Sequence, residues 1–115
     1  MALNLPDQTE YLTIPDLCER WALTPGKLHR LIEDHQVVAI RVDGVLRVPA
    51  EFAPEDGPLN SLRGTVLALL DAGFTDDEAV AWLLSENEEL GERPIAALLA
   101  GKKSAVRRAT QALAF

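Results

Sequence analysis

Few side chains in this sequence are spaced for catalysis or for metal binding. His29 and His35 lie six positions apart, so one helical face cannot present both, and no nearby acid or cysteine completes a ligand set. Cys18 shares the helical spacing of apolar neighbours, which is typical of a packed core thiol. The sequence contains no phosphate-binding loop, dinucleotide fingerprint or serine elbow. We therefore predict that the protein is not an enzyme and that it uses no metal and no cofactor.

The chemistry that the sequence does offer is the binding of phosphate and base edges by a few local cations. The chain is acidic as a whole, with a formal net charge of −7, so it does not attract nucleic acid through its total charge. Cations nevertheless stand in a helical stretch and in the hairpin that follows it, and lysine and arginine are common partners of DNA. The predicted DNA-binding residues are Pro25, Gly26, Lys27, Arg30, Arg41 and Arg47.

Two short helices joined by a tight turn are predicted to position the first of these residues. Apolar residues recur at i, i+3, i+4 and i+7 over residues 14–21, with Thr13 as the N-cap and Asp16 three positions later. A second helix, at about residues 25–34, has Thr24 as its cap and a proline at its first position. Its apolar residues Leu28, Leu31 and Ile32 mark the buried side, so Gly26 and Arg30 lie opposite, with Lys27 beside them. The link of two or three residues between the two helices has the length found in a helix-turn-helix. The second helix is therefore the predicted recognition helix.

A β-hairpin, the wing, is predicted over residues 37–48, directly after the second helix. Its sequence "VVAIRVDGVLRV" carries a turn signal at Asp43-Gly44. Two registers are compatible with this signal. A two-residue loop opposes Val42 with Val45 and places the two arginines of the wing on opposite faces of the hairpin.

The other register uses a three-residue loop, residues 42–44, with Gly44 in the left-handed conformation. It opposes Ile40 with Leu46, which collects the large apolar side chains on one face and the two arginines on the other. A sheet with one buried face is held in register by such segregation. We therefore predict the three-residue loop, with both arginines on the outward face. Helix, turn, helix and basic wing together have the layout of a winged helix.

The C-terminal half is predicted to be helical and to carry separated charges. From Phe74 to Glu92 there are seven acids and no base, and from Arg93 to Phe115 there are five bases and no acid. Two interpretations remain open, since the two segments could attract each other within the chain or could bind a partner. The predicted partner surface consists of Arg93, Lys102, Lys103, Arg107 and Arg108.

Residues 11–53 resemble the excisionase-type winged helix-turn-helix, through the opening "LTI-DLCE-W", the "LHRLI" of the second helix, and the wing pattern that ends at Pro49. The whole chain is similar to a small actinobacterial DNA-binding family that includes a substrate of a membrane Ser/Thr protein kinase. The resemblance makes Thr9, which lies between Asp7 and Glu10 in a stretch expected to be exposed, a candidate phosphorylation site; the residues alone favour an unmodified linker threonine. Trp82 and the Arg93-Pro94 pair also make the C-terminal region similar to the toxin-binding domain of a class of antitoxins.

The predicted fold is mainly α with a small β-hairpin, a winged helix-turn-helix followed by a C-terminal helical subdomain. The predicted segments are a flexible tail (1–10), the winged helix-turn-helix (11–53), a linker (54–58) and the helical region (59–115). The predicted function is duplex DNA binding and transcriptional regulation. The alternative is a protein-interaction module that binds a partner through its C-terminal helices, with the winged helix as a scaffold.

Further predictions concern location and assembly. The longest apolar runs have about six residues, too few for a membrane span. With no signal-peptide pattern and a single cysteine, we predict a cytoplasmic protein without membrane insertion. The expected partners are double-stranded DNA, a Ser/Thr protein kinase, and a second copy or another protein at the C-terminal helices.

Overall fold

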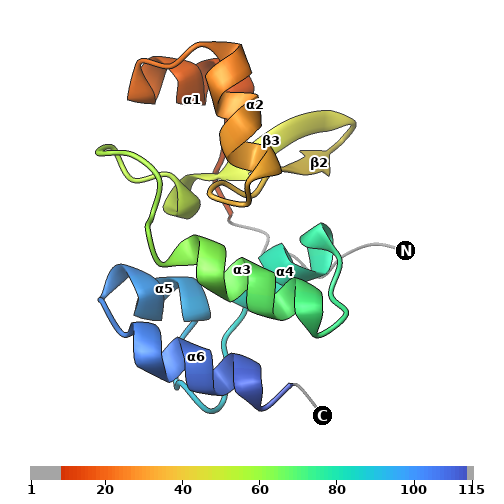
Figure 1. Cartoon of the computed structure of the whole chain (residues 1–115), viewed down its shortest axis with the longest axis vertical. Helices are drawn as coiled ribbons and strands as arrows, with labels where there is room; N and C mark the ends of the chain where they lie inside the picture. Colours follow the sequence, from red (N-terminus) through yellow and green to blue (C-terminus); the bar gives the residue numbers. More distant parts are fainter. Residues whose placement is uncertain (1–8, 114–115) are drawn as a thin grey trace. The chain divides into compact units, whose positions relative to one another are not determined.

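The computed structural model describes residues 9–113, which divide into two compact units (Figure 1). The described residues up to Arg63 form the first unit, and those from Gly64 onward form the second. Most of the predicted flexible tail, residues 1–8, lies outside the described residues. The predicted fold class is confirmed: the chain is mainly helical, with a small antiparallel sheet in the first unit.

Helix α1 (Ile14–Trp21) begins with a reciprocal cap that the sequence predicted. The Thr13 hydroxyl accepts a hydrogen bond from the Asp16 N–H at 3.3 Å, and the Asp16 carboxylate accepts one from the Thr13 N–H at 3.1 Å. This is a capping box, which satisfies two backbone donors that the first helical turn leaves open. The bonds from Thr13, chiefly the one from its backbone N–H, hold the pKa of Asp16 below the ordinary value of 3.8.

Helix α2 (Pro25–Glu33) follows after three residues, so the predicted link length is confirmed. Ala22 ends α1 in the left-handed region, at φ +53°, and lets the chain turn sharply. The Thr24 hydroxyl then accepts the Lys27 N–H at 3.2 Å and caps α2. Leu28 is fully buried, which fixes the face of α2 that packs inward.

Three short strands form the sheet of the first unit: β1 (Tyr11–Thr13), β2 (Ile40–Val42) and β3 (Val45–Pro49). The order is β1-β3-β2 and both pairings are antiparallel, so β3 is the central strand. The sequence predicted the hairpin but not β1. The backbone pairing extends to Glu10, whose carbonyl accepts the Ala50 N–H at 2.9 Å.

The predicted register of the wing is wrong. The loop has two residues, Asp43 and Gly44, at φ +53° and +80°. Two successive left-handed residues are typical of a type I′ turn, and the positive φ of Gly44 is the part of the prediction that is confirmed. As a result, Arg41 and Arg47 lie on opposite faces of the hairpin. The cross-strand pairs are Ile40–Arg47, Arg41–Leu46 and Val42–Val45.

Two physical reasons favour the observed register. A type I′ turn matches the right-handed twist of the strands that it joins. The prediction also assumed a hairpin with a single buried face, whereas buried side chains lie on both faces of the sheet around β3. Val48, paired with Leu12, is fully buried on one face, and Ile40, paired with Arg47, is 2% exposed on the other. Segregation of apolar residues therefore does not select the register here.

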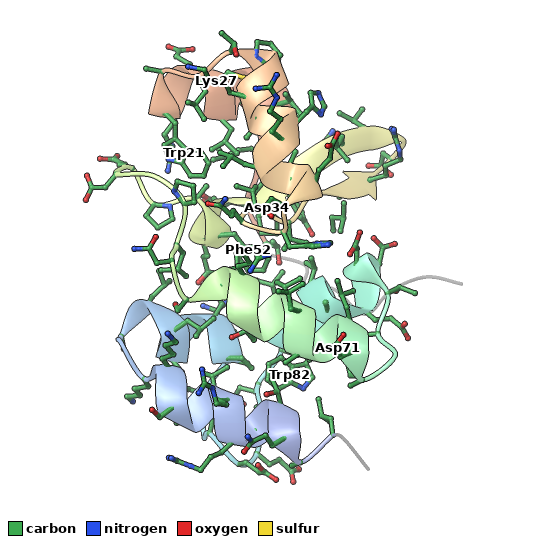
Figure 2. The ribbon with its side chains drawn as sticks, viewed as in Figure 1. Trp21, Lys27, Asp34, Phe52, Asp71 and Trp82 are labelled. Atoms are coloured by element: carbon green, nitrogen blue, oxygen red, sulfur yellow. The ribbon has the colours of Figure 1, made fainter. Side chains whose placement is uncertain are left out.

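Buried apolar side chains from α1, α2, the sheet and the 3₁₀ turn η1 (Ala50–Phe52) form the core of the first unit, and Figure 2 shows Phe52 below the two helices. The chain after η1 is tied to α1 by two hydrogen bonds. The Trp21 indole Nε1 donates to the Pro54 carbonyl at 2.7 Å, and the Arg20 guanidinium donates to the Ala53 carbonyl at 2.9 Å. These bonds hold the start of the predicted linker against the helix-turn-helix.

The second unit consists of helices. They are α3 (Leu62–Asp71), α4 (Asp76–Leu84), α5 (Pro94–Leu99) and α6 (Lys103–Gln111). The first of them, α3, begins two residues before the boundary between the units at Gly64. Buried aliphatic side chains from these helices form their shared core. It includes Val66, Leu69, Val80, Leu83, Ile95, Leu98 and Val106. Within residues 9–113, no helix has the length and apolar character needed to cross a bilayer.

The helices of the second unit differ in how they begin. Helix α4 starts with a second capping box, in which Thr75 and Glu78 exchange hydrogen bonds. It follows a turn at Gly73, at φ +99°, that ends α3. Helix α6 instead starts after Lys102, which makes no side-chain cap bond, and the first turn of α6 holds no acid.

Candidate nucleic-acid interface

The exposed face of α2 brings together four of the six residues predicted to bind DNA. Pro25, Gly26, Lys27 and Arg30 are all exposed, whereas Leu28 faces the core. Figure 2 shows Lys27 near the start of α2. A Cβ built on Gly26 meets nothing within 4 Å, so the backbone is open to solvent at this point. The exposed face of α2 therefore offers one cation in its first turn, Lys27, and one in its last turn, Arg30, along a backbone that a ligand can approach closely at Gly26.

The acidic end of α2 is partly neutralised by a residue that the sequence analysis missed. Arg63 donates from Nε to the Asp34 carbonyl at 2.9 Å, and its Nη2 lies 3.5 Å from Asp34 Oδ1. The Gln36 amide donates to the other carboxylate oxygen of Asp34 at 2.7 Å. Because the Arg63 and Asp34 side chains are each about half exposed (48% and 52%), this pair contributes little stability, at most about 1 kcal/mol. It does balance the charge of Asp34 at the end of α2.

The two arginines of the wing do not share a surface, contrary to the prediction. Arg41 is exposed, and its Nη1 donates to the Gly44 carbonyl at 3.2 Å, which lays the side chain along the turn. Arg47 is half-buried in the central strand, between Thr13 and Ile40. Its Nε is buried and has no hydrogen-bond partner in the structure. Arg41 is therefore the accessible cation of the wing, whereas much of Arg47 belongs to the sheet.

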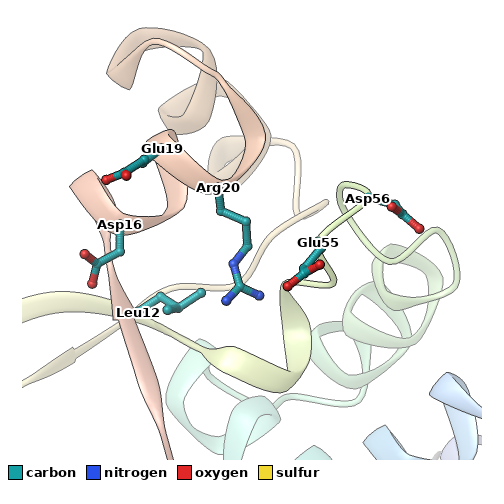
Figure 3. A pocket seen from close by; sticks show the side chains of 6 residues that line it. All are labelled: Leu12, Asp16, Glu19, Arg20, Glu55 and Asp56. Atoms are coloured by element: carbon teal, nitrogen blue, oxygen red, sulfur yellow. The ribbon is translucent and has the colours of Figure 1, made fainter.

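The opposite side of the helix-turn-helix, around α1, is acidic. Figure 3 shows a shallow groove between α1 and the segment after η1, with the Arg20 side chain among carboxylates. Phosphate would be repelled on this side, because four carboxylates outnumber a single guanidinium that already binds a backbone carbonyl. The groove is lined by Leu12, Asp16, Glu19, Arg20, Glu55 and Asp56.

The predicted partner surface is divided in the structure. Arg93 is half-buried at the start of α5 and has an interaction of its own. Lys102 binds Glu92, with Nζ 2.8 Å from Oε2, so one pair joins the acidic and the basic segments within the chain. The other predicted members are exposed on a single helix, α6. They are Lys103, Arg107 and Arg108.

The remaining candidates for chemistry are scattered. His29 is exposed on α2, His35 is half-buried after it, and Cys18 is a half-buried free thiol on α1. Over residues 9–113, no group of three or more histidines, cysteines and acids is arranged to hold a metal ion. Thr9, the predicted phosphorylation site, is half-buried rather than exposed.

Comparison with known proteins identifies both halves of the chain. A family model described as "DNA-binding protein Rv2175c, wHTH domain" matches residues 3–53, and one described as "Rv2175c C-terminal domain of unknown function" matches residues 59–114. DNA-binding protein Rv2175c of Mycobacterium tuberculosis (strain ATCC 25618 / H37Rv) is 28% identical over 123 residues, which cover 96% of this chain and 84% of the relative. An NMR structure of Rv2175c matches with a TM-score of 0.85 and 25% identity, over 97% of this chain and 86% of that one. The chain therefore belongs to the Rv2175c family, with a winged helix-turn-helix DNA-binding domain followed by the C-terminal domain of that family.

Proposed function

We propose that this protein binds duplex DNA in a sequence-dependent manner through α2 and that it regulates transcription. The observation that carries the proposal is the exposed face of α2, where Lys27 follows the open backbone of Gly26 and Arg30 lies one helical turn beyond Gly26. No acid occurs in α2 before Glu33, at the far end. The family assignment to a DNA-binding domain supports the same conclusion.

The proposed contacts follow from the geometry of α2 and the wing. In a helix-turn-helix, the amino-terminal part of the recognition helix contacts base edges in the major groove. Lys27, in the first turn of α2, and Arg30, one turn beyond Gly26, can donate to guanine O6 and N7 or to the flanking phosphates. Arg41, exposed at the wing, is the proposed contact to an adjacent phosphate, whereas Arg47 contributes only through the part of its guanidinium that solvent reaches.

The acidity of the protein sets the expected strength of binding. With a net charge of −7 and few exposed cations on the reading face, long-range attraction to DNA is weak. Each phosphate contact that releases a counterion adds about 0.9 to the slope of log affinity against log salt. We therefore propose that binding is weak and salt-sensitive for one copy, and that two copies bind together when a site is occupied in the cell.

The test is a selection from a pool of random duplexes, followed by anisotropy titrations of the enriched and the unselected duplexes at several salt concentrations. The proposal predicts an enriched motif, a tighter affinity for it than for the pool, and a negative salt slope for both. Enrichment of no motif, or an absence of binding at low salt, contradicts it.

We also propose that phosphorylation of Thr9 weakens DNA binding. Thr9 is followed by Glu10 and then by β1, and Asp7 lies two positions before it. A phosphate adds about −1.5 to −2 charges at neutral pH, which increases the repulsion between an acidic protein and the duplex. The Thr9→Glu variant should therefore bind DNA more weakly than wild type, most clearly at low salt, where charges are least screened. Equal affinity at low salt contradicts this switch.

A further inference from the structure

Helix α6 presents a cationic face that meets no counter-charge among residues 9–113. Lys103 and Arg107 lie one turn apart on the same side of the helix, and Arg108 is the next residue. All three are exposed, while Val106, Ala109 and Thr110 on the other side are buried. Ser104 and Gln111, which are also exposed, complete the outward side. We call this set of five exposed residues the α6 face.

The charges of the α6 face differ from those of its neighbour Lys102, which is neutralised by Glu92 at 2.8 Å. In the described part of the chain, no salt bridge or hydrogen bond engages the side chains of Lys103, Arg107 or Arg108; the Thr110 hydroxyl donates to the backbone carbonyl of Arg107. Like charges one turn apart destabilise a helix, and a lysine in the first turn also opposes the helix dipole. An anion bound across the α6 face would relieve both effects.

We propose that the α6 face is a second DNA-binding surface, which contacts the phosphates of duplex DNA and reads no bases. The choice of DNA as the polyanion rests on the proposed function of α2, although the α6 face can be tested without it. The ends of the cationic side chains, not the helix backbone, would meet the phosphates, because this face has no glycine at which the backbone could come close.

The composition of the α6 face favours phosphate over an acidic protein. Lysine, arginine, serine and glutamine side chains are typical phosphate contacts. Protein interfaces instead centre on aromatic or aliphatic anchors in a desolvated patch. No large apolar side chain is exposed on α6 within the described residues; Leu99, at 47% exposure, is on α5. An acidic protein partner would need an anchor such as Leu99, whereas a phosphate backbone would not.

The test compares the full-length wild type with the triple variant Lys103→Gln/Arg107→Gln/Arg108→Gln in anisotropy titrations against duplexes of different sequence. Loss of three phosphate contacts should lower the magnitude of the salt slope by about 2.7, for every sequence alike. The ratio of affinities between sequences should not change, because bases are not read here. Arg107→Lys/Arg108→Lys, which keeps the charges, should bind like wild type.

A matched control separates the α6 face from the total charge of the protein. Arg107→Gln and Ser85→Asp each lower the net charge by one, and both positions are exposed in the second unit. Arg107→Gln should lower the slope by about 0.9, whereas Ser85→Asp, outside α6, should leave it unchanged. Thermal unfolding of each variant checks that the fold is kept, which matters most for Ser85→Asp because the Ser85 hydroxyl donates to the Ala81 carbonyl at 2.7 Å.

A variant of α2, Lys27→Ala/Arg30→Ala, distinguishes failure of this inference from failure of the proposed function. Both surfaces bind DNA if two results hold. The α2 variant should lose sequence preference but keep a residual salt-dependent affinity for DNA, and adding the triple substitution to it should abolish that residual affinity. A triple variant with the wild-type slope overturns the α6 proposal while leaving α2 intact. The α6 proposal is equally overturned by a second result. In this result the triple variant binds DNA normally but no longer binds an acidic protein that wild type binds, and Leu99→Ser shows the same loss.

Discussion

The outward faces of α2 and α6 both carry exposed cations, but the surroundings of those cations differ. On α2, Lys27 and Arg30 are next to Gly26 and a proline, so the helix backbone itself is accessible. The α6 face carries more cations but only long or hydroxyl side chains around them. A small residue lets a helix approach base edges, whereas a charged surface suffices for phosphate. We therefore expect the capacity to read sequence to depend on close approach more than on the number of positive charges.

The largest effect is expected from Lys27→Ala/Arg30→Ala. A lost base contact costs about 1–3 kcal/mol, and lost phosphate contacts lower the salt slope by about one each. Affinity for the preferred duplex should therefore fall at least tenfold, with loss of preference over other duplexes. Glu33→Gln, which removes a charge of the opposite sign from the same helix, is the control and should bind DNA at least as tightly as wild type. Unchanged preference in the double variant would mean that α2 does not read the bases.

A substitution of Gly26 tests whether close approach matters. Gly26→Leu adds bulk where a Cβ meets nothing within 4 Å, so the fold should tolerate it. Gly64→Leu in α3 is the matched control, because Gly64 is likewise exposed and helical with open space around it. Each change should stabilise its helix, by up to about 1 kcal/mol. Only Gly26→Leu should weaken DNA binding, and equal affinity of the two variants would break the comparison between α2 and α6.

The two arginines of the wing should separate binding from stability. Methionine removes the charge of either residue and keeps an apolar stem, so Arg41→Met and Arg47→Met form a matched pair. Arg41→Met should lower the salt slope by about 0.9 and leave the melting temperature unchanged. Arg47→Met removes a buried N–H that has no partner and should keep or raise the melting temperature. If Arg47→Met weakens DNA binding more than Arg41→Met, Arg47 is the main cation of the wing.

The smallest effect is expected at acidic pH and concerns the N-terminal caps of α1 and α2, which differ in chemistry. The folded-state pKa of Asp16 is lowered by its bonds from Thr13, so the capping box stabilises α1 fully above the ordinary pKa of 3.8. That stability is lost as the pH falls through the lowered pKa. The cap of α2 uses the Thr24 hydroxyl, with Lys27 where α1 has its acid. NMR spectra between pH 6 and pH 2 should show the Thr13 amide respond to this titration, and Asp16→Asn should abolish the response.

Local chemistry explains why much of the fold could be predicted from the sequence. The threonine caps of α1, α2 and α4 act within three residues of chain, so their signals are contiguous in the sequence. The same is true of the apolar periodicity that identifies the core side of α2. The exposed positions of Lys27 and Arg30 followed from that periodicity.

The rest depended on contacts between distant residues. Strand β1 pairs with β3 across more than thirty residues, and its presence makes the β3 strand central, which removed the basis of the predicted wing register. The neutralisation of Asp34 by Arg63 spans 29 positions and has no local signal in the sequence. Lys102 differs from the other bases of the C-terminal segment because it pairs with Glu92, and the sequence alone does not show that these two side chains meet.

The most direct test of DNA reading by α2 is an NMR titration of the isotope-labelled full-length protein with a selected duplex. The amide signals of Gly26, Lys27 and Arg30 should shift most, together with those of the wing turn at residues 43–45. The α1 side, at Asp16 and Glu19, should stay unchanged. Shifts confined to α1 or to the second unit, with α2 unaffected, would contradict the assignment of α2 as the recognition helix.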